Sequence, residues 1–275
     1  MTTDEMWRLP LRTDAVATAL AGSRWRPEVL ASSPSTNAVV ADRARAGESP
    51  GLLVVTDHQT AGRGRLDRTW VTPAGVALTF SMLVAPGDVP VARWPWLPLL
   101  AGVAVAHAVR RAAGVDARLK WPNDVLVDDA KTTGILVERV EGPRHASAVI
   151  GIGVNVLQTR DELPVDTATS LAVAAGRPVD RVALLAAIAD ELGRGYDDWC
   201  AAAGDAGASG LLATYTGLCA TVGLQVRVEL PRDEVLIGEA TGIDEDGRLL
   251  VAGPSGAVAL GAGDVVHVRR SLPPA

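Results

Sequence analysis

Short apolar runs and longer helical patterns alternate along the first 200 positions of the chain. Apolar runs bounded by glycine or polar residues predict strands at 52–56, 76–84, 119–127, 134–140 and 148–156. Amphipathic or alanine-rich stretches predict helices at 13–22, 37–46, 97–113 and 182–199. From 224 to 268, four or five short apolar runs separated by turns predict a small all-β barrel. The pattern therefore predicts a mixed region of helices and strands, followed by a compact β region.

Composition and charge exclude several classes of protein. The formal net charge is −6 over 275 residues, and no run of lysine or arginine forms a basic stripe, which argues against DNA or RNA as a partner. The chain lacks the apolar core of a signal peptide, and no apolar run reaches the ~20 residues that a membrane span needs. The only cysteines, Cys200 and Cys219, imply no disulfide framework, so we expect a cytoplasmic protein. The four histidines lie far apart, so local spacing predicts no protein metal site.

Lysine and asparagine are rare, and each is found in segments of interest. Of the 26 basic residues only Lys120 and Lys131 are lysine, which makes them candidates for a compact ammonium that a planar guanidinium cannot replace. The alternative is that they are ordinary solvated surface groups. The only asparagines are Asn37, Asn123 and Asn155.

The first segment that carries chemistry runs from His58 to Trp70 and contains Gly62-Arg63-Gly64-Arg65. Glycine lets the backbone approach an anion closely, and arginine brings planar charge to carboxylate or phosphate. We expect a loop that is mobile when empty and closed when filled. The alternatives are an arginine/glycine contact to nucleic acid, which the charge disfavours, or a solvated turn.

Two further segments follow, and a fourth precedes them. Lys120-Trp121-Pro122-Asn123-Asp124 and the run from Lys131 to Glu138 predict a hairpin whose two lysines converge on one anion, unless Asp124 merely pairs with a lysine. In Gly151-Ile152-Gly153-Val154-Asn155, the asparagine suits the edge of an adenine ring, or else satisfies a local turn. The run Ser33–Asn37 predicts a helix cap with free hydroxyls. No P-loop occurs, so ATP would be bound without one.

Taken in this order, these segments resemble the biotin–protein ligase family, of the type without an amino-terminal DNA-binding domain. The resemblance spans about residues 30 to 268 and rests on Ser35-Thr36-Asn37, Gln59, Gly62–Arg65 with Arg68 and Trp70, Lys120–Asp124, Lys131 with Gly134–Leu136, and Gly151–Asn155. It implies an α+β fold: a catalytic domain like class II aminoacyl-tRNA synthetases over 1–215, with a mixed sheet and helices, and a carboxyl-terminal SH3-like β-barrel over 216–275.

The resemblance also implies an activity and its partners. Biotin and ATP would give biotinyl-5′-AMP and pyrophosphate, with Mg²⁺ accompanying the nucleotide, and a lysine of a biotin carboxyl carrier domain would then take the biotinyl group. The implied enzyme is a monomer or weak dimer that binds neither DNA nor membrane. Only 34 residues precede Ser35, too few for the winged helix of the family's regulatory members.

The resemblance also implies a role for each position that matches a family motif. The resemblance implies that biotin contacts Ser35, Thr36, Asn37, Gln59, Gly62, Arg63, Gly64, Arg65, Lys131, Gly134, Gly151 and Gly153, with Ser35, Thr36, Gln59 and Arg63 at the ureido head. It implies that the nucleotide contacts Arg65, Arg68, Trp70, Asn123, Asp124, Lys131 and Asn155, the last of these at adenine. Lys131, Arg65 and Lys120 are the implied catalytic residues.

The chain departs from the family pattern at two places. Asp67 stands where the family commonly has glycine, so we expect slower or looser closure of the loop unless Arg68 pairs with it. Thr132-Thr133 replaces a small apolar pair, which is a milder change. Three rival functions remain: a lipoate–protein ligase of similar fold, a biotin-binding protein without turnover, and a nucleic-acid-binding module. The Gly-Arg-Gly-Arg and Lys-Trp-Pro-Asn-Asp segments favour biotin, and the retained cations favour catalysis.

Overall fold

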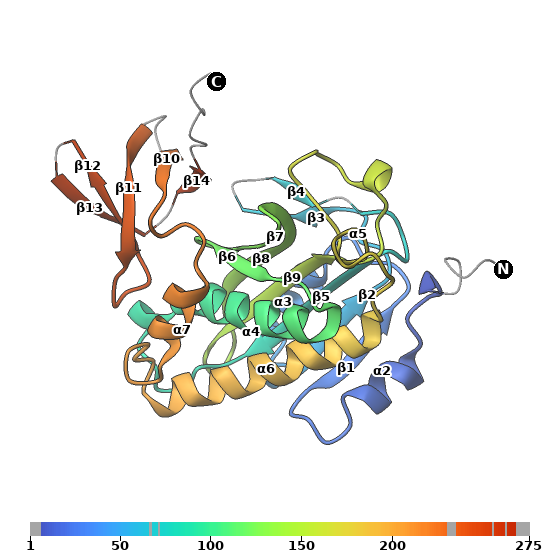
Figure 1. Ribbon diagram of the computed structural model, residues 1–275. Coiled ribbons are helices and arrows are strands. Elements are labelled where there is room, and N and C mark those ends of the chain that lie inside the picture. Colours follow the sequence, from blue (N-terminus) through green and yellow to red (C-terminus); the bar gives the residue numbers. More distant parts are fainter. Residues whose placement is uncertain are drawn as a thin grey trace.

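A mixed sheet of seven strands forms the centre of the computed structural model (Figure 1). The structure describes residues 7–65, 68–70, 72–229, 235–254, 256–261 and 263–267. The strand order is β1-β2-β5-β9-β8-β7-β6, with β1 and β2 parallel and the other neighbours antiparallel. The strands are β1 (Arg26–Leu30), β2 (Leu52–Thr56), β5 (Ala77–Val84), β6 (Ala117–Lys120), β7 (Asp124–Val127), β8 (Ala130–Glu141) and β9 (Ala146–Asn155).

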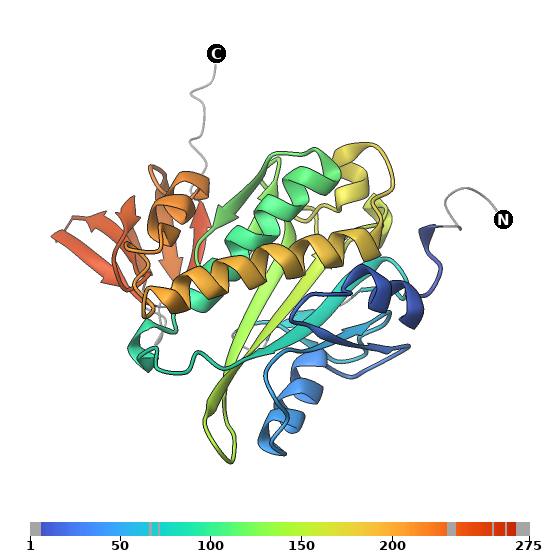
Figure 2. The same ribbon diagram turned by 90° about the horizontal axis from the view of Figure 1, so that it is seen from below.

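Helices cover both faces of this sheet (Figure 2). They are α2 (Thr13–Ala19), α3 (Thr36–Arg45), α4 (Trp96–Ala113), α5 (Leu171–Ala175), α6 (Arg181–Ala201) and α7 (Leu211–Leu218), with short 3₁₀ turns at Val91–Arg93 and Arg160–Glu162. The long helices α4 and α6 pack on one face and α3 on the other. None of the helices in the described ranges is long and apolar enough to cross a membrane.

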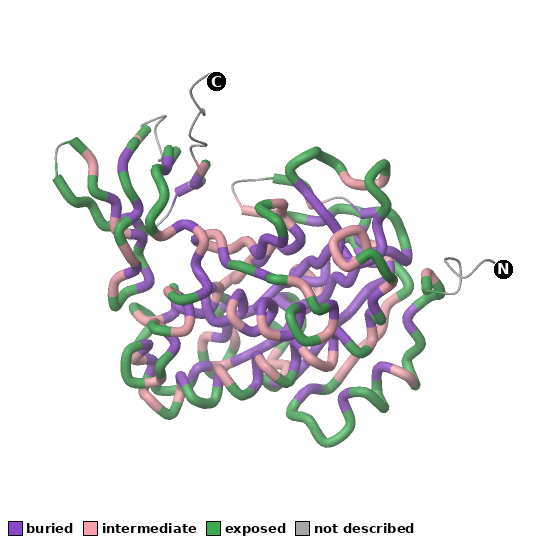
Figure 3. The backbone as a smooth tube through the Cα atoms, viewed as in Figure 1, coloured by how far each residue is buried: buried purple, intermediate pink, exposed green. Residues whose placement is uncertain are grey.

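Burial on both faces explains why β2 is apolar throughout rather than alternating. Leu53 and Val55 belong to the main core beneath α4 and α6, whereas Leu52 and Val54 belong to a smaller cluster beneath α3. A strand covered on both sides needs apolar side chains at every position. Figure 3 shows the result, with buried residues concentrated in the sheet and on the inner sides of the helices.

One predicted strand is wrong. The run predicted as a single strand over 119–127 forms two antiparallel strands, β6 and β7, joined by a turn at 121–123. Pro122 has no backbone N–H to donate to a ladder, so the strand ends before it. The reversal makes β6 an edge strand and places Trp121 at the junction with the carboxyl-terminal sheet, where its Nε1 donates to the carbonyl of Gly247 at 3.0 Å.

The carboxyl-terminal part is a five-stranded antiparallel sheet in the order β13-β12-β11-β10-β14. Its strands are β10 (Gln225–Glu229), β11 (Val235–Ile243), β12 (Leu249–Gly253), β13 (Gly256–Leu260) and β14 (Asp264–His267). Along β10, Val226 and Val228 face inward and their neighbours face solvent, the alternation of a one-sided sheet. The predicted α+β class, with a mixed sheet and a terminal β region, is confirmed. The predicted domain boundary between 215 and 216 falls inside α7.

Candidate active site

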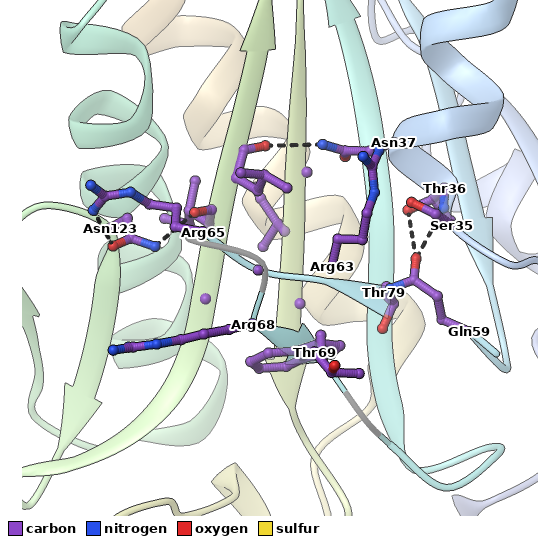
Figure 4. A pocket seen from close by; sticks show the side chains of 18 of the residues that line it. Ser35, Thr36, Asn37, Gln59, Arg63, Arg65, Arg68, Thr69, Thr79 and Asn123 are labelled. Atoms are coloured by element: carbon purple, nitrogen blue, oxygen red, sulfur yellow. Dashed lines mark hydrogen bonds between the residues drawn. The ribbon is translucent and has the colours of Figure 1, made fainter. Parts of the chain in front are cut away.

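Most of the predicted site residues line one cavity above the middle of β8 and β9 (Figure 4). A two-stranded ribbon, β3 (Gly62–Arg63) with β4 (Thr69–Trp70), covers it, and the amino-terminus of α3 closes one end. The predicted residues that line it are Ser35, Thr36, Asn37, Gln59, Arg63, Gly64, Arg65, Arg68, Trp70, Asn123, Asp124, Lys131, Gly134, Gly151 and Gly153. The cavity also includes Gly263, which lies just before β14 in the carboxyl-terminal part, so both parts of the chain contribute to it.

A polar cluster forms the end of the cavity beside α3. Ser35 is the N-cap of that helix and accepts from the amide of Ala38, as the sequence predicts. The backbone N–H of Thr36 donates to Gln59 Oε1 at 3.0 Å, and the Thr36 hydroxyl oxygen lies 3.3 Å from the same atom. All three side chains are buried. Hydroxyl and amide groups at such a closed end suit a small polar head group that both donates and accepts hydrogen bonds.

Asn37 lines the cavity, but its polar atoms are held by the protein. Its Nδ2 donates to Glu138 Oε2 at 2.7 Å and to the carbonyl of Leu136 at 3.3 Å, and its Oδ1 accepts from Ser81 Oγ at 2.6 Å. A Cβ on Gly151 would lie 2.0 Å from Asn37 Oδ1, so only glycine leaves room for this side chain. The predicted contact of Asn37 with biotin stays a prediction.

Sequence reasoning assigned no role to Ser81 or Glu138, yet both belong to this network. Ser81 is a fully buried polar residue inside the apolar run of β5. A polar residue in such a run needs a buried hydrogen-bond partner, and this is the sequence signal that could have identified it. Glu138 closes the Gly-Ile-Leu-Val-Glu run on β8, where nothing in the sequence relates it to Asn37.

The opposite end of the cavity is cationic. Lys131 Nζ forms an ion pair with Asp124 Oδ1 at 2.7 Å and lies 6.0 Å from the centre of the Trp70 ring. Arg65 reaches the same space and donates from Nη1 to Asn123 Oδ1 at 3.1 Å. The structure therefore brings Arg65 and Lys131 to one cavity, and Asp124 does pair with a lysine. An anion entering here would meet cations from the ribbon and from β8.

Three predicted residues do not line this cavity. Gly62 lines the outer groove next to it. Lys120 ends the edge strand β6 and does not line this cavity; its backbone is in register with Asp124, the partner of Lys131, and the expected convergence of the two lysines on one anion stays a prediction. The pKa of His267 is lowered mainly by burial, and the charge of Lys120 lowers it further. Asn155 is buried, accepts from Gln158 Nε2 at 2.9 Å and donates to the carbonyl of Thr169 at 3.2 Å, so its side chain already has partners outside the cavity.

A broader groove of about 1000 Å³ opens beside the cavity and shares the arginines of the ribbon with it. Its walls come from the start of α4, the turn at Trp121 and Pro122, and residues 246–248 in the turn between β11 and β12. Asp67, from which looser closure is expected, lies outside the described residues. Within the described ranges, no three histidine, cysteine, aspartate or glutamate residues gather as a metal site.

Comparisons with known proteins match this architecture. Residues 29–155 match the model of the biotin/lipoate A/B protein ligase family, and residues 221–268 match the biotin protein ligase C-terminal domain. The biotin–[acetyl-CoA-carboxylase] ligase of Mycobacterium tuberculosis is 37% identical, over 98% of this chain and 100% of that protein. The enzyme of the same name from Paracoccus denitrificans is 33% identical, over 86% and 98%. The structure of the Aquifex aeolicus biotin protein ligase in complex with biotin and ATP superposes with a TM-score of 0.74 at 26% identity, over 89% and 99% of the two chains.

Proposed function

This chain belongs to the biotin protein ligase family, and we propose from that premise how its cavity joins biotin to a carrier lysine through biotinyl-5′-AMP. The observation that carries the proposal is that one cavity has a closed polar end at Thr36 and Gln59 and a cationic end at Arg65 and Lys131. Biotin has the matching shape, with a polar ureido ring at one end and a carboxylate at the other. We place the ureido ring beside α3 and the carboxylate beside Lys131.

In the first half-reaction, a carboxylate oxygen of biotin attacks the α-phosphate of ATP, and pyrophosphate leaves. Two anions must approach each other, so cations that offset their charge lower the barrier. Lys131 lies where it can contact both the carboxylate and the α-phosphate, and Arg65 on the ribbon closes over the product. In the second half-reaction, the amine of the carrier lysine attacks the acyl carbon, and AMP leaves.

Magnesium enters this proposal with the nucleotide. Asp124 is a carboxylate on the cavity wall, and Mg²⁺ is commonly held by one or two carboxylates together with substrate phosphates. The donor set therefore fits a nucleotide-borne ion rather than a dedicated protein site, and such an ion would offset the phosphate charge. The roles of Lys120 as a catalytic residue and Asn155 at adenine stay predictions, because neither lines the cavity.

The outer groove is where we place the carrier. A biotin carboxyl carrier domain must bring its lysine to the acyl carbon, and this groove adjoins the cavity along the ribbon arginines. We further propose a catalytic domain over 1–215, a carboxyl-terminal domain over 216–275 and a monomer or weak dimer. A cytoplasmic protein without DNA or membrane partners agrees with the net charge of −6 and with the two free cysteines.

Biotin-dependent exchange of pyrophosphate into ATP tests the proposal, with lipoate as the competing substrate. The named relatives favour biotin, and we expect exchange with biotin and none with lipoate. Lys131→Ala should lower the exchange rate at least about 100-fold, the usual cost of removing one preorganised donor at such a centre. The matched control is Arg139→Ala, an exposed cation on the same strand, which should exchange at the parent rate. Exchange by Lys131→Ala at the parent rate would remove Lys131 from the mechanism.

A further inference from the structure

A chain of polar contacts runs from the cavity wall to a carboxylate outside it. Thr36 Oγ1 lies 2.7 Å from Ser81 Oγ, Ser81 Oγ lies 2.6 Å from Asn37 Oδ1, and Asn37 Nδ2 lies 2.7 Å from Glu138 Oε2. Thr36, Ser81 and Asn37 are 2%, 0% and 5% exposed, so bulk water has little access to compete for these contacts. The four side chains come from α3, β5 and β8, which makes this a tertiary feature.

The acceptor at the far end decides which way every proton in the chain points. An ionised carboxylate and a backbone carbonyl only accept, so the Asn37 amide turns its NH₂ toward Glu138 at 2.7 Å and the carbonyl of Leu136 at 3.3 Å, and its oxygen toward Ser81. Ser81 lies within hydrogen-bond distance of both Thr36 Oγ1 and Asn37 Oδ1 but has only one proton. Because the Asn37 oxygen has no proton of its own and is the nearer at 2.6 Å, Ser81 donates to it and accepts from Thr36, which does have a proton to give. The Thr36 hydroxyl proton then goes to Ser81 at 2.7 Å rather than to Gln59 Oε1, its other neighbour, at 3.3 Å.

The consequence appears at the cavity wall. With its proton committed, Thr36 Oγ1 offers only lone pairs to a ligand and cannot donate. Gln59 Oε1 is satisfied by the backbone N–H of Thr36 at 3.0 Å. A ureido ring has two N–H donors, and a hydroxyl oxygen that can only accept suits one of them.

We propose that Glu138 is a positioning residue: through Asn37 and Ser81 it fixes the Thr36 hydroxyl as a hydrogen-bond acceptor for a ureido N–H. This rests on the proposed function and deepens it, because it explains why a carboxylate that does not line the inner cavity controls recognition there. Glu138 also faces Arg63, but that contact is 3.4 Å long between side chains that are 53% and 32% exposed. Such an exposed pair adds little, so the short bond to Asn37 carries the effect.

Glu138→Gln tests the proposal, because it removes the short charged bond and leaves only the longer bond to the Leu136 carbonyl as an obligatory acceptor for the Asn37 NH₂. We expect KM for biotin in pyrophosphate exchange to rise about tenfold, which corresponds to about 1.4 kcal/mol. KM for ATP and kcat should stay within about twofold of the parent values, because the effect acts at the ureido end. The control is Glu141→Gln on the same strand, an exposed carboxylate paired with Arg139, which should leave all three constants unchanged.

A second measurement distinguishes a changed hydrogen-bond direction at Thr36 from a general loss of packing. Biotin and its two mono-N-methyl ureido isomers are compared by calorimetric binding to the parent and to each variant. The parent should discriminate strongly against one isomer, and Glu138→Gln should lose most of that discrimination. Ser81→Ala removes the middle of the chain without changing charge and should reproduce both effects. Glu138→Asp, which keeps the charge, should restore part of the discrimination.

The results of these measurements lead to different conclusions about Glu138. Parent-like biotin KM and parent-like discrimination in both Glu138→Gln and Ser81→Ala would overturn the proposal. A parallel fall in kcat and rise in both KM values, with a lowered Tm, would also overturn it, because that pattern describes damaged packing. If the parent itself shows no biotin-dependent exchange, the proposed function fails and this inference falls with it, whatever the variants do.

Discussion

Trp70 anchors the ribbon over the cavity, and Gly153→Ala should dislodge it. A Cβ at position 153 would lie 2.6 Å from Trp70 Cε2 and 2.8 Å from its Nε1, whereas ordinary van der Waals contact begins at 3.4 Å. A Cβ at Gly134 would also approach this ring, at 3.2 Å, so the indole rests on two glycines of the sheet. The rigid ring must lift away from β9, and β4 and the rest of the ribbon must move with it.

The cost follows from the size of the clash. Adding a methyl group to a packed contact typically costs about 1–3 kcal/mol. If that cost makes closure of the ribbon over biotin less favourable by the same amount, affinity for biotin should fall roughly fivefold to 150-fold. Gly242→Ala is the matched control, because it places a methyl group on a strand where the nearest atom, Leu250 Cδ1, lies at an ordinary 3.9 Å. That variant should bind biotin as the parent does.

A double-mutant cycle identifies Trp70 as the cause. Calorimetry gives the affinity for biotin of the parent, Gly153→Ala, Trp70→Ala and the double variant. The three atoms nearest to the added methyl group all belong to the indole, so once the indole is absent Gly153→Ala should cost little in the Trp70→Ala background. The coupling energy should then nearly equal the cost of Gly153→Ala alone. An equal loss of affinity in both backgrounds would refute the reasoning.

Two further predictions concern stability. Arg181→Met should lower the free energy of unfolding in urea by about 3–5 kcal/mol, because it leaves the charge of Asp57 without its cation in a pair whose side chains are only 3% and 9% exposed. Asp42→Asn breaks an exposed pair and should cost under about 1 kcal/mol, and an equal loss in the two variants would contradict the argument. Burial lowers the pKa of His267 in the folded chain. As pH falls below about 6.5, the unfolded chain therefore binds a proton at His267 before the folded chain does, and the free energy of unfolding decreases. His267→Gln should lose less stability than the parent between pH 7 and pH 5, whereas the exposed His145→Gln should follow the parent; identical curves for parent and His267→Gln would exclude this role.

Local signals in the sequence predict the elements well where one residue type enforces the structure. Ser35 predicts the start of α3, because its hydroxyl satisfies a backbone N–H that the helix leaves open. The continuous apolar run of β2 predicts a buried strand. The prediction of one strand over 119–127 failed because it relied on the apolar residues and neglected Pro122. A proline has no N–H to donate to a sheet, so it is also a local signal.

Recognition of the site from sequence worked because its residues lie in short consecutive segments. Glycine, arginine and lysine at set spacings have chemical meaning before any fold is known, and most of them do line one cavity. Lys120 shows the limit, since the rarity of lysine suggested a place in the same site and Lys120 does not line the cavity. Spacing along the chain gives no distance across a sheet.

The sequence by itself determined most of the long elements, their order, and which chemical groups the chain holds, because these depend on side chains and their near neighbours. Only the tertiary structure decided that Ser81 and Glu138 join Asn37, and that Trp70 rests on the glycines of β8 and β9. Those contacts join residues 44 to 101 positions apart for the Asn37 pairs. They arise when strands distant in sequence become neighbours in the sheet, and no local preference encodes that pairing.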